Sequence, residues 1–194
     1  MANSCSIEIP EELRRKCNDN GLLSHGKSYI FEQRSRIFHN RLTVMKWLGI
    51  AVPMLVYALI TRFKMGEEAL PVIITAASIL STILLILSSW SMAADWEKQY
   101  HKGLLAQMDF SELGRRYKEL GETTLLSLAE YKAEVSRLDS LMEKADHLAM
   151  ELKISDEEKL MGMRSGLREY KRECASCEKI PFDMNPTKCP VPCN

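Results

Sequence analysis

The stretch ALPVIITAASILSTILLILSSWSMAA (residues 69–94) decides the fold, because it contains no charged side chain. As a helix rising about 1.5 Å per residue it would be roughly 39 Å long, enough to cross a hydrocarbon core of ~30 Å. A second uncharged run, WLGIAVPMLVYALIT (residues 47–61), is long enough if its helix begins near Leu42 and the ammonium of Lys46 extends to the headgroups. The alternative is a helical hairpin buried in a soluble protein. We predict a two-span membrane hairpin over residues 42–94.

The distribution of basic residues predicts the orientation of this hairpin. The short link between the runs balances its basic and acidic side chains, whereas basic side chains gather on both outer flanks. Cytoplasmic flanks carry the excess of Lys and Arg, so both termini should lie in the cytoplasm. The flanking residues are Lys27, Arg34, Arg36, Arg41 and Lys46 before the spans, then Lys98, Lys102, Arg115 and Arg116 after them.

Charge and periodicity limit the remaining possibilities. The chain has 26 basic and 26 acidic residues, which excludes a globally basic nucleic-acid binder but leaves a local patch open. No segment alternates with period two, so the sequence predicts an all-α membrane protein. We expect cytoplasmic helices over 1–41, the hairpin over 42–94, a helical or coiled-coil region over 95–172 and a cysteine-containing tail over 173–194.

A heptad stripe crosses the region after the hairpin. Apolar residues recur there at alternating three- and four-residue steps, which is typical of a bundle helix or a coiled coil. It can pack against the protein's own first helix or against another copy of the chain. Ser155 and Glu158 form a capping box, which predicts a new helix running to about Arg172. The stripe consists of Leu128, Tyr131, Val135, Leu138, Met142, Ala145, Ala149 and Leu152.

The segment GLLSHGKS (residues 21–28) matches the pattern of a phosphate-binding loop. Such a loop must follow a buried strand, and a charged helical stretch precedes this one. We therefore interpret Gly21 and Gly26 as marking a break between two helices. No catalytic constellation is recognisable elsewhere, so the sequence predicts a protein that is not an enzyme.

Hydroxyl side chains form a stripe on the second predicted span. Small and hydroxylic residues let membrane helices approach closely, and this is one interpretation. The other is that the stripe lines a polar pore when several hairpins assemble. The stripe consists of Thr75, Ser78, Thr82 and Ser89.

The last segment, ECASCEKIPFDMNPTKCPVPCN (residues 173–194), contains two closely spaced pairs of cysteines. Such pairs can place four thiolates around a zinc ion at about 2.3 Å, with no position left open for chemistry. A cytoplasmic tail is kept reduced, which favours structural Zn²⁺ over a disulfide. A redox-active pair and lipid-modified cysteines also stay open. The predicted ligands are Cys174, Cys177, Cys189 and Cys193.

The chain resembles the SLATT superfamily of two-span membrane effectors. The resemblance rests on the entry SRIFHNRLTVMKWLGI, the hairpin, and the long helix after SSWSMAADWEKQYHKG. The tail resembles a mobile-element-associated subgroup with the signature CxxC-x(11)-CxxC. Cys174, Cys177 and Cys189 match that signature, and the last pair departs from it as C-x3-C, ending at Cys193.

The resemblance implies a pore-forming or membrane-disrupting effector of a bacterial antiviral defence or conflict system, located in the inner (plasma) membrane. We expect homo-oligomers in membrane lipid, opened by a cytoplasmic signal from a nucleotide-signal synthase or another defence partner. The alternative is a membrane-anchored module whose zinc-binding tail recruits a protein or a nucleic acid.

Overall fold

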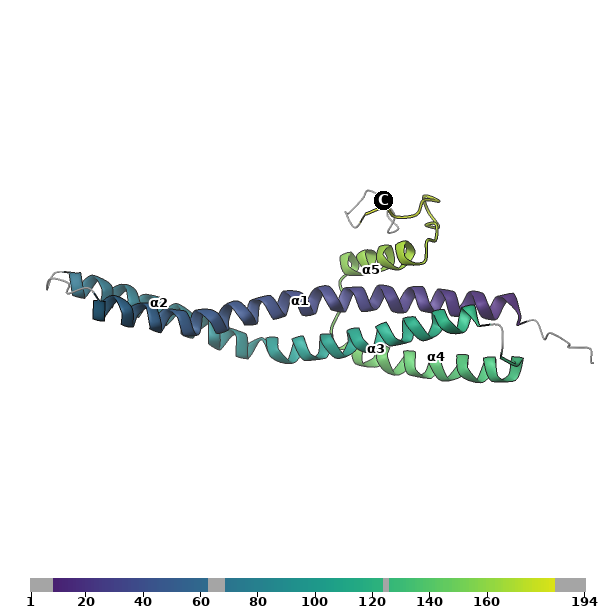
Figure 1. Ribbon diagram of the computed structural model, residues 1–194, viewed down its shortest axis with the longest axis horizontal. Coiled ribbons are helices and arrows are strands. Elements are labelled where there is room, and N and C mark those ends of the chain that lie inside the picture. Colours follow the sequence, from purple (N-terminus) through teal and green to yellow (C-terminus); the bar gives the residue numbers. More distant parts are fainter. Residues whose placement is uncertain (1–8, 63–68, 124–125, 184–194) are drawn as a thin grey trace, which may run out of the picture. The chain divides into compact units, whose positions relative to one another are not determined.

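The computed structural model describes residues 9–62, 69–123 and 126–183, and these contain five helices and no strand. The prediction of an all-α fold is confirmed for this part of the chain. The structure divides into a core unit, residues 1–34 with 102–194, and a hairpin unit, residues 35–101. The helices are α1 (Glu11–Arg62), α2 (Ala69–Ala93), α3 (Trp96–Glu122), α4 (Leu128–Met150) and α5 (Asp156–Glu169) (Figure 1).

Helix α1 is continuous for 52 residues, so the predicted break at Gly21 and Gly26 is wrong. Both glycines lie inside the helix, which also excludes a phosphate-binding loop over residues 21–28. A glycine inside a helix costs about 1 kcal/mol relative to alanine, so tertiary contacts must offset two such losses.

The compensating contact is a close approach of α5 to α1 in the core unit. A Cβ atom on Gly26 would lie 2.6 Å from the carbonyl oxygen of Gly162, and one on Gly166 would lie 2.7 Å from the carbonyl oxygen of Leu22. Real Cβ atoms essentially never approach a backbone oxygen so closely. Gly26 and Gly166 are therefore required by backbone contact between two helices, and not by a turn.

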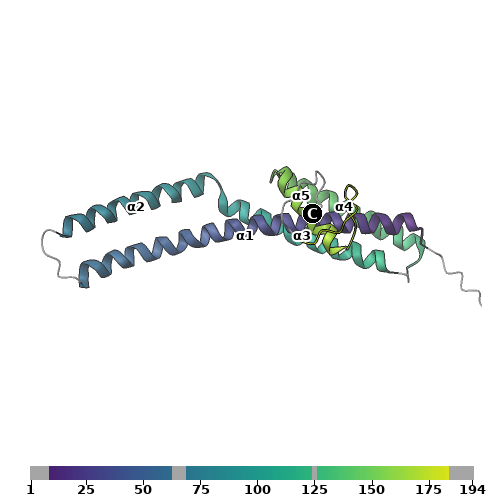
Figure 2. The ribbon, with the colours of Figure 1, turned by 90° about the horizontal axis from the view of Figure 1, so that it is seen from above.

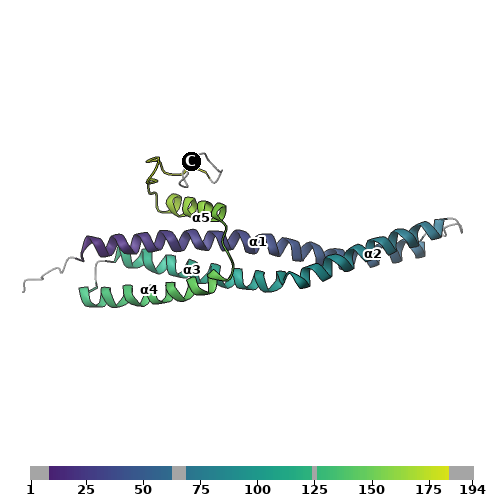
Figure 3. The same ribbon diagram turned by 180° about the vertical axis from the view of Figure 1, so that it is seen from behind.

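The heptad stripe of α4 lies in the core of the same unit, where α1, α3 and α4 run side by side (Figures 1 and 3). Phe31 of α1 and Phe110 of α3 stack with ring centroids 5.8 Å apart. Of the two predicted partners for the stripe, the chain's own first helix is confirmed. The stripe residues that are buried are Tyr131, Val135, Leu138, Ala145 and Ala149, and Met142 and Leu152 pack against them.

Local capping chemistry sets where α4 and α5 begin. Ser155 caps α5 through a capping box with Glu158, as predicted, and α5 ends at Glu169. An equivalent box, formed by Ser127 and Glu130, starts α4. In each box the serine oxygen accepts from the glutamate N–H, while the glutamate side chain accepts from the serine N–H.

Three cationic side chains of α1 pair with carboxylates of α4 and α5. Lys16 contacts Asp139 and Lys27 contacts Asp146, each with 2.5 Å between nitrogen and oxygen. Asp139 also accepts from the hydroxyl of Tyr117, at 2.8 Å, and from the amide of Asn20, at 3.1 Å. Arg34 makes the third pair, with Glu158. The two pairs with α4 are partly exposed and contribute little energy singly, so their main effect is to fix the register of α1 along α4.

In the hairpin unit, α2 runs antiparallel beside the second half of α1 (Figures 1 and 2). Most of the apolar side chains described there point outward. Trp47 is 68 % exposed, Leu85 67 % and Trp90 66 %. An apolar surface of this extent is not buried within the unit.

Candidate functional site

The predicted metal centre is described only in its first half. Cys174 is 1 % exposed and Cys177 is half-buried with a free thiol, whereas Cys189 and Cys193 lie outside the described residues. Among the described residues there is no group of three or more His, Cys, Asp or Glu that could hold a metal ion. The four-ligand site therefore stays a prediction.

A tight turn holds the first cysteine pair. The N–H of Glu178 donates to the carbonyl oxygen of Cys174 at 2.9 Å, and the N–H of Cys174 donates to the carbonyl oxygen of Lys179 at 3.0 Å. Glu178 has φ 53°, the left-handed conformation that lets the chain reverse directly after Cys177. The turn places both cysteines of the pair on one short loop.

One backbone group of this turn points at sulfur. The N–H of Ser176 donates to the Sγ of Cys174 at 3.4 Å. Cys174 is disulfide-bonded in this structure, while zinc binds only the reduced thiolate. Metal binding by Cys174 therefore requires reducing conditions.

The tail is anchored to α1 next to this turn. Arg172 pairs with Asp19, and Cys174 lines a pocket of about 290 Å³ together with Leu22 and Leu167. Pro181 is buried as well. The first cysteine pair is thus attached to the helical core and does not hang from it on a free linker.

Nearly the whole chain matches one protein family. The family described as "Mobilome CxxCx(11)CxxC protein" covers residues 14–194. The chain belongs to this family. No curated protein and no solved structure matches the chain.

Membership in the mobilome CxxCx(11)CxxC family supports the first three cysteine positions. Cys174 and Cys177 form the first pair, and the gap to Cys189 has the family's length. Two thiol pairs at this spacing suggest metal binding, and zinc is the ion that such pairs most often hold. In this member the second pair is widened by one residue, ending at Cys193.

The hairpin unit contributes the second candidate site. Two helical segments are long and apolar enough to cross a membrane, by length and composition. In the most apolar window of each, only 6 % and 0 % of the residues are buried within the structure. The core helix of a soluble protein would be mostly buried, so the exposure favours the membrane alternative.

The predicted hydroxyl stripe lies on α2, and its members are exposed in the single chain. Three hydroxyls donate back to carbonyl oxygens of their own helix: Thr75 to Pro71 at 2.7 Å, Ser78 to Ile74 at 2.8 Å and Thr82 to Ser78 at 2.9 Å. Satisfied in this way, the hydroxyls can face lipid or a neighbouring helix without loss of a hydrogen bond.

Aromatic and cationic side chains meet at the base of the hairpin, a cluster that the sequence-based prediction does not contain. Arg41 lies over the ring of Trp96, with 5.5 Å to the centroid, and the rings of His39 and Tyr100 are 5.7 Å apart. Amphipathic aromatic residues favour the membrane–water interface. The position of Trp96 directly after α2 is the signal that could have indicated this cluster.

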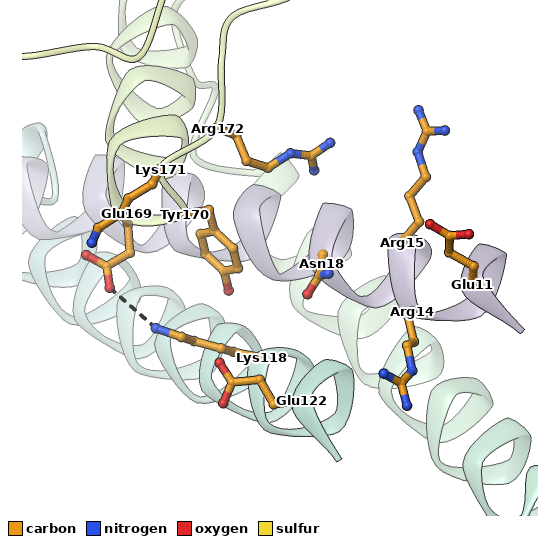
Figure 4. A pocket seen from close by; sticks show the side chains of 10 residues that line it. All are labelled: Glu11, Arg14, Arg15, Asn18, Lys118, Glu122, Glu169, Tyr170, Lys171 and Arg172. Atoms are coloured by element: carbon orange, nitrogen blue, oxygen red, sulfur yellow. Dashed lines mark ion pairs between the residues drawn. The ribbon is translucent and has the colours of Figure 1, made fainter. Parts of the chain in front are cut away.

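A charged cavity of about 610 Å³ in the core unit is likewise absent from the prediction (Figure 4). It lies where the start of α1, the end of α3 and the end of α5 come together. The ring of Tyr170 lies beside Lys118, with 5.9 Å from the ammonium to the ring centroid, and the pKa of Tyr170 is raised to about 12, chiefly by burial. The charged residues that line the cavity are Arg14, Arg15, Lys118, Lys171 and Arg172 with Glu11, Glu122 and Glu169.

Proposed function

We propose that the protein is a non-enzymatic membrane effector of a bacterial defence or conflict system. In this proposal the hairpin unit inserts into the inner membrane with both termini in the cytoplasm, and a cytoplasmic signal makes it permeabilise the bilayer. The observation that carries the proposal is the outward-facing apolar surface of two helices that are long enough to span. Such a surface costs roughly 25 cal/mol per Å² in water and is favourable in lipid.

The family supports the biological setting of this proposal. Its description associates these proteins with mobile genetic elements, where conflict systems act. The likeness to SLATT effectors points in the same direction, and a nucleotide-signal synthase or another defence protein would supply the signal.

Assembly of several copies needs a face other than the heptad stripe. Tyr131, Val135 and Leu138 are buried against the chain's own helices and are not available to a neighbour. Apolar side chains remain exposed on α3 and α4, with Leu105 62 % and Leu148 63 % exposed. Contacts between copies would form through such residues and through α2.

A depolarisation assay tests the proposal. Cells overproducing the protein would be followed with a membrane-potential dye, beside cells producing Ile83→Arg or Ala133→Arg. Ile83 lies exposed in the middle of α2, where an arginine opposes insertion by about 3 kcal/mol; Ala133 is exposed on α4 and serves as the matched control.

We expect depolarisation with the wild type and Ala133→Arg, and none with Ile83→Arg. Unchanged potential and growth with the wild type, during overproduction and during phage challenge alike, would refute the effector.

A membrane-anchored binding module is the second candidate. It is favoured by the ordered turn around Cys174, which joins the tail to the core unit. Here Zn²⁺ would shape the tail to grip a protein or a nucleic acid. Removal of residues 173–194 distinguishes the two: lost partner capture with unaltered membrane effects indicates the module.

A further inference from the structure

The charged cavity of the core unit has more cationic than anionic side chains in its wall. Five cationic side chains and three carboxylates line it, and they come from α1, α3, α5 and the turn after α5 (Figure 4). Its volume of about 610 Å³ lies within the ~300–1,000 Å³ typical of small-molecule sites.

Two of the five cations are already engaged. Lys118 lies 3.9 Å from a carboxylate oxygen of Glu169, and Arg172 pairs with Asp19. The remaining three, Arg14, Arg15 and Lys171, have no ion pair with any residue that the structure describes.

Arg14 supplies a second, independent observation. Its Nε–H group is buried and has no hydrogen-bond acceptor among the described residues. A buried donor that stays unpaired destabilises the fold by about 1–3 kcal/mol, and by more when the group is charged, so native structures normally supply an acceptor. An anionic oxygen bound in the cavity would supply such an acceptor.

We propose that this cavity binds a small anion carrying two or more phosphate groups. Arginine and lysine side chains on several elements suit a phosphate better than they suit a single carboxylate. One phosphate accepts hydrogen bonds from several donors that approach in different directions. Glu11, Glu122 and Glu169 keep the wall from attracting every anion equally. They would receive the hydrogen-bond donors of the ligand.

The cavity would receive the cytoplasmic signal of the effector, and in that role the inference rests on the proposed function. Binding itself needs no membrane event. If the cavity binds phosphate and the cells are not depolarised, this inference holds and the proposed effector function is refuted. If the cells are depolarised and the cavity does not bind phosphate, the effector function holds and this inference is refuted.

Calorimetric titration of the full chain in detergent micelles with inorganic tripolyphosphate tests the site. Citrate, a carboxylate polyanion, is titrated in parallel at about 0.1 M salt, where the Debye length is about 10 Å. The variants are Arg15→Gln and Lys171→Gln, both exposed, with Arg14→Gln as a third. Lys132→Gln is the control, because Lys132 is exposed on α4, outside the cavity, and carries the same charge.

We expect saturable binding of tripolyphosphate, tighter than that of citrate. Each cavity variant should weaken it about tenfold, as the loss of one charge-assisted hydrogen bond does, and Lys132→Gln should leave it unchanged. Helical circular dichroism of every variant verifies the fold. Absence of saturable binding, citrate binding as tightly, or equal weakening by Lys132→Gln would each overturn the inference.

Discussion

Arg34 of α1 donates to both carboxylate oxygens of Glu158, the capping residue of α5, and so ties the first helix to the last. The same guanidinium donates to the carbonyl oxygens of Leu152 and Lys153, in the turn that joins α4 to α5. One side chain thereby binds both the turn after α4 and the first turn of α5.

This contact predicts a loss of stability in acid. The hydrogen bonds from Arg34, followed by those from Ser155, lower the pKa of Glu158 to about 2 from 4.5. A carboxylate whose folded pKa is lowered stabilises the fold above its unfolded pKa, and the contribution disappears as the pH falls from 4.5 toward 2. With both side chains about one quarter exposed, we expect a loss of about 2 kcal/mol.

This loss is measured by chemical unfolding of the wild type and Glu158→Gln between pH 6 and pH 2, a range of about four units. The variant should be less stable near neutrality and should show a flatter pH dependence. Glu157→Gln is the control, since Glu157 is exposed in the same first turn of α5. Identical pH profiles for both variants and the wild type would contradict the assignment.

The contact between α1 and α5 predicts that small additions will be costly. Gly162→Ala and Gly166→Ala each bring a methyl group against backbone oxygen, and we expect each to reduce the free energy of unfolding by about 1–3 kcal/mol. Gly49→Ala is the matched control, because nothing lies within 4 Å of a Cβ there. That change should be neutral or stabilising by up to about 1 kcal/mol.

Denaturant titration followed by helical circular dichroism, with all three proteins in the same detergent, makes the comparison. Equal stability of Gly162→Ala and Gly49→Ala would show that α5 does not pack closely on α1.

The cysteine tail predicts one zinc ion per chain under reducing conditions. Cys174→Ser and Cys177→Ser should each abolish tight binding, since each removes one of four thiolates. Cys193→Ser examines the position that departs from the family spacing. Cys17→Ala is the control, because Cys17 is buried in the core and far from the tail in sequence.

Zinc per chain is measured by elemental analysis after gel filtration in the presence of a reductant. Full zinc content in Cys174→Ser would eliminate the predicted site, and full content in Cys193→Ser alone would assign the fourth ligand elsewhere.

The hydroxyl stripe on α2 distinguishes a pore from a packing surface. Thr82→Val and Ser78→Ala remove hydroxyls at nearly constant volume and leave the helix apolar. If the stripe lines a pore, ion flux through reconstituted vesicles should fall while oligomer size stays constant. If it packs helices together, flux should persist, since the hydroxyls already bond within their own helix.

Short-range chemistry explains which parts of the fold can be predicted. The cap at Ser155 is a local pattern, and its prediction is confirmed. The same pattern at Ser127 starts α4; it is equally local and is the signal that the prediction lacks for the start of this helix. The sequence alone assigns Gly26 to a break, because its partner, Gly162, is remote in the chain.

The candidate sites divide in the same way. The candidate metal site can be proposed from the sequence because Cys174 and Cys177 are close together in the chain. The charged cavity cannot, because Arg14, Lys118 and Lys171 belong to segments that only the helical packing brings together. Neither the composition nor the periodicity of a sequence indicates contacts between segments that are remote in the chain.

The reactivity of the Cys17 thiol can report how often the helical core opens. Its side chain is fully buried, it accepts a hydrogen bond from the hydroxyl of Tyr131, and burial raises the pKa of its thiol. Alkylating reagents attack thiolates, so this sulfur should react only while α1 and α4 are transiently apart. The alkylation rate of Cys17 in the otherwise native chain would therefore time the fluctuations of the bundle, without any label being introduced.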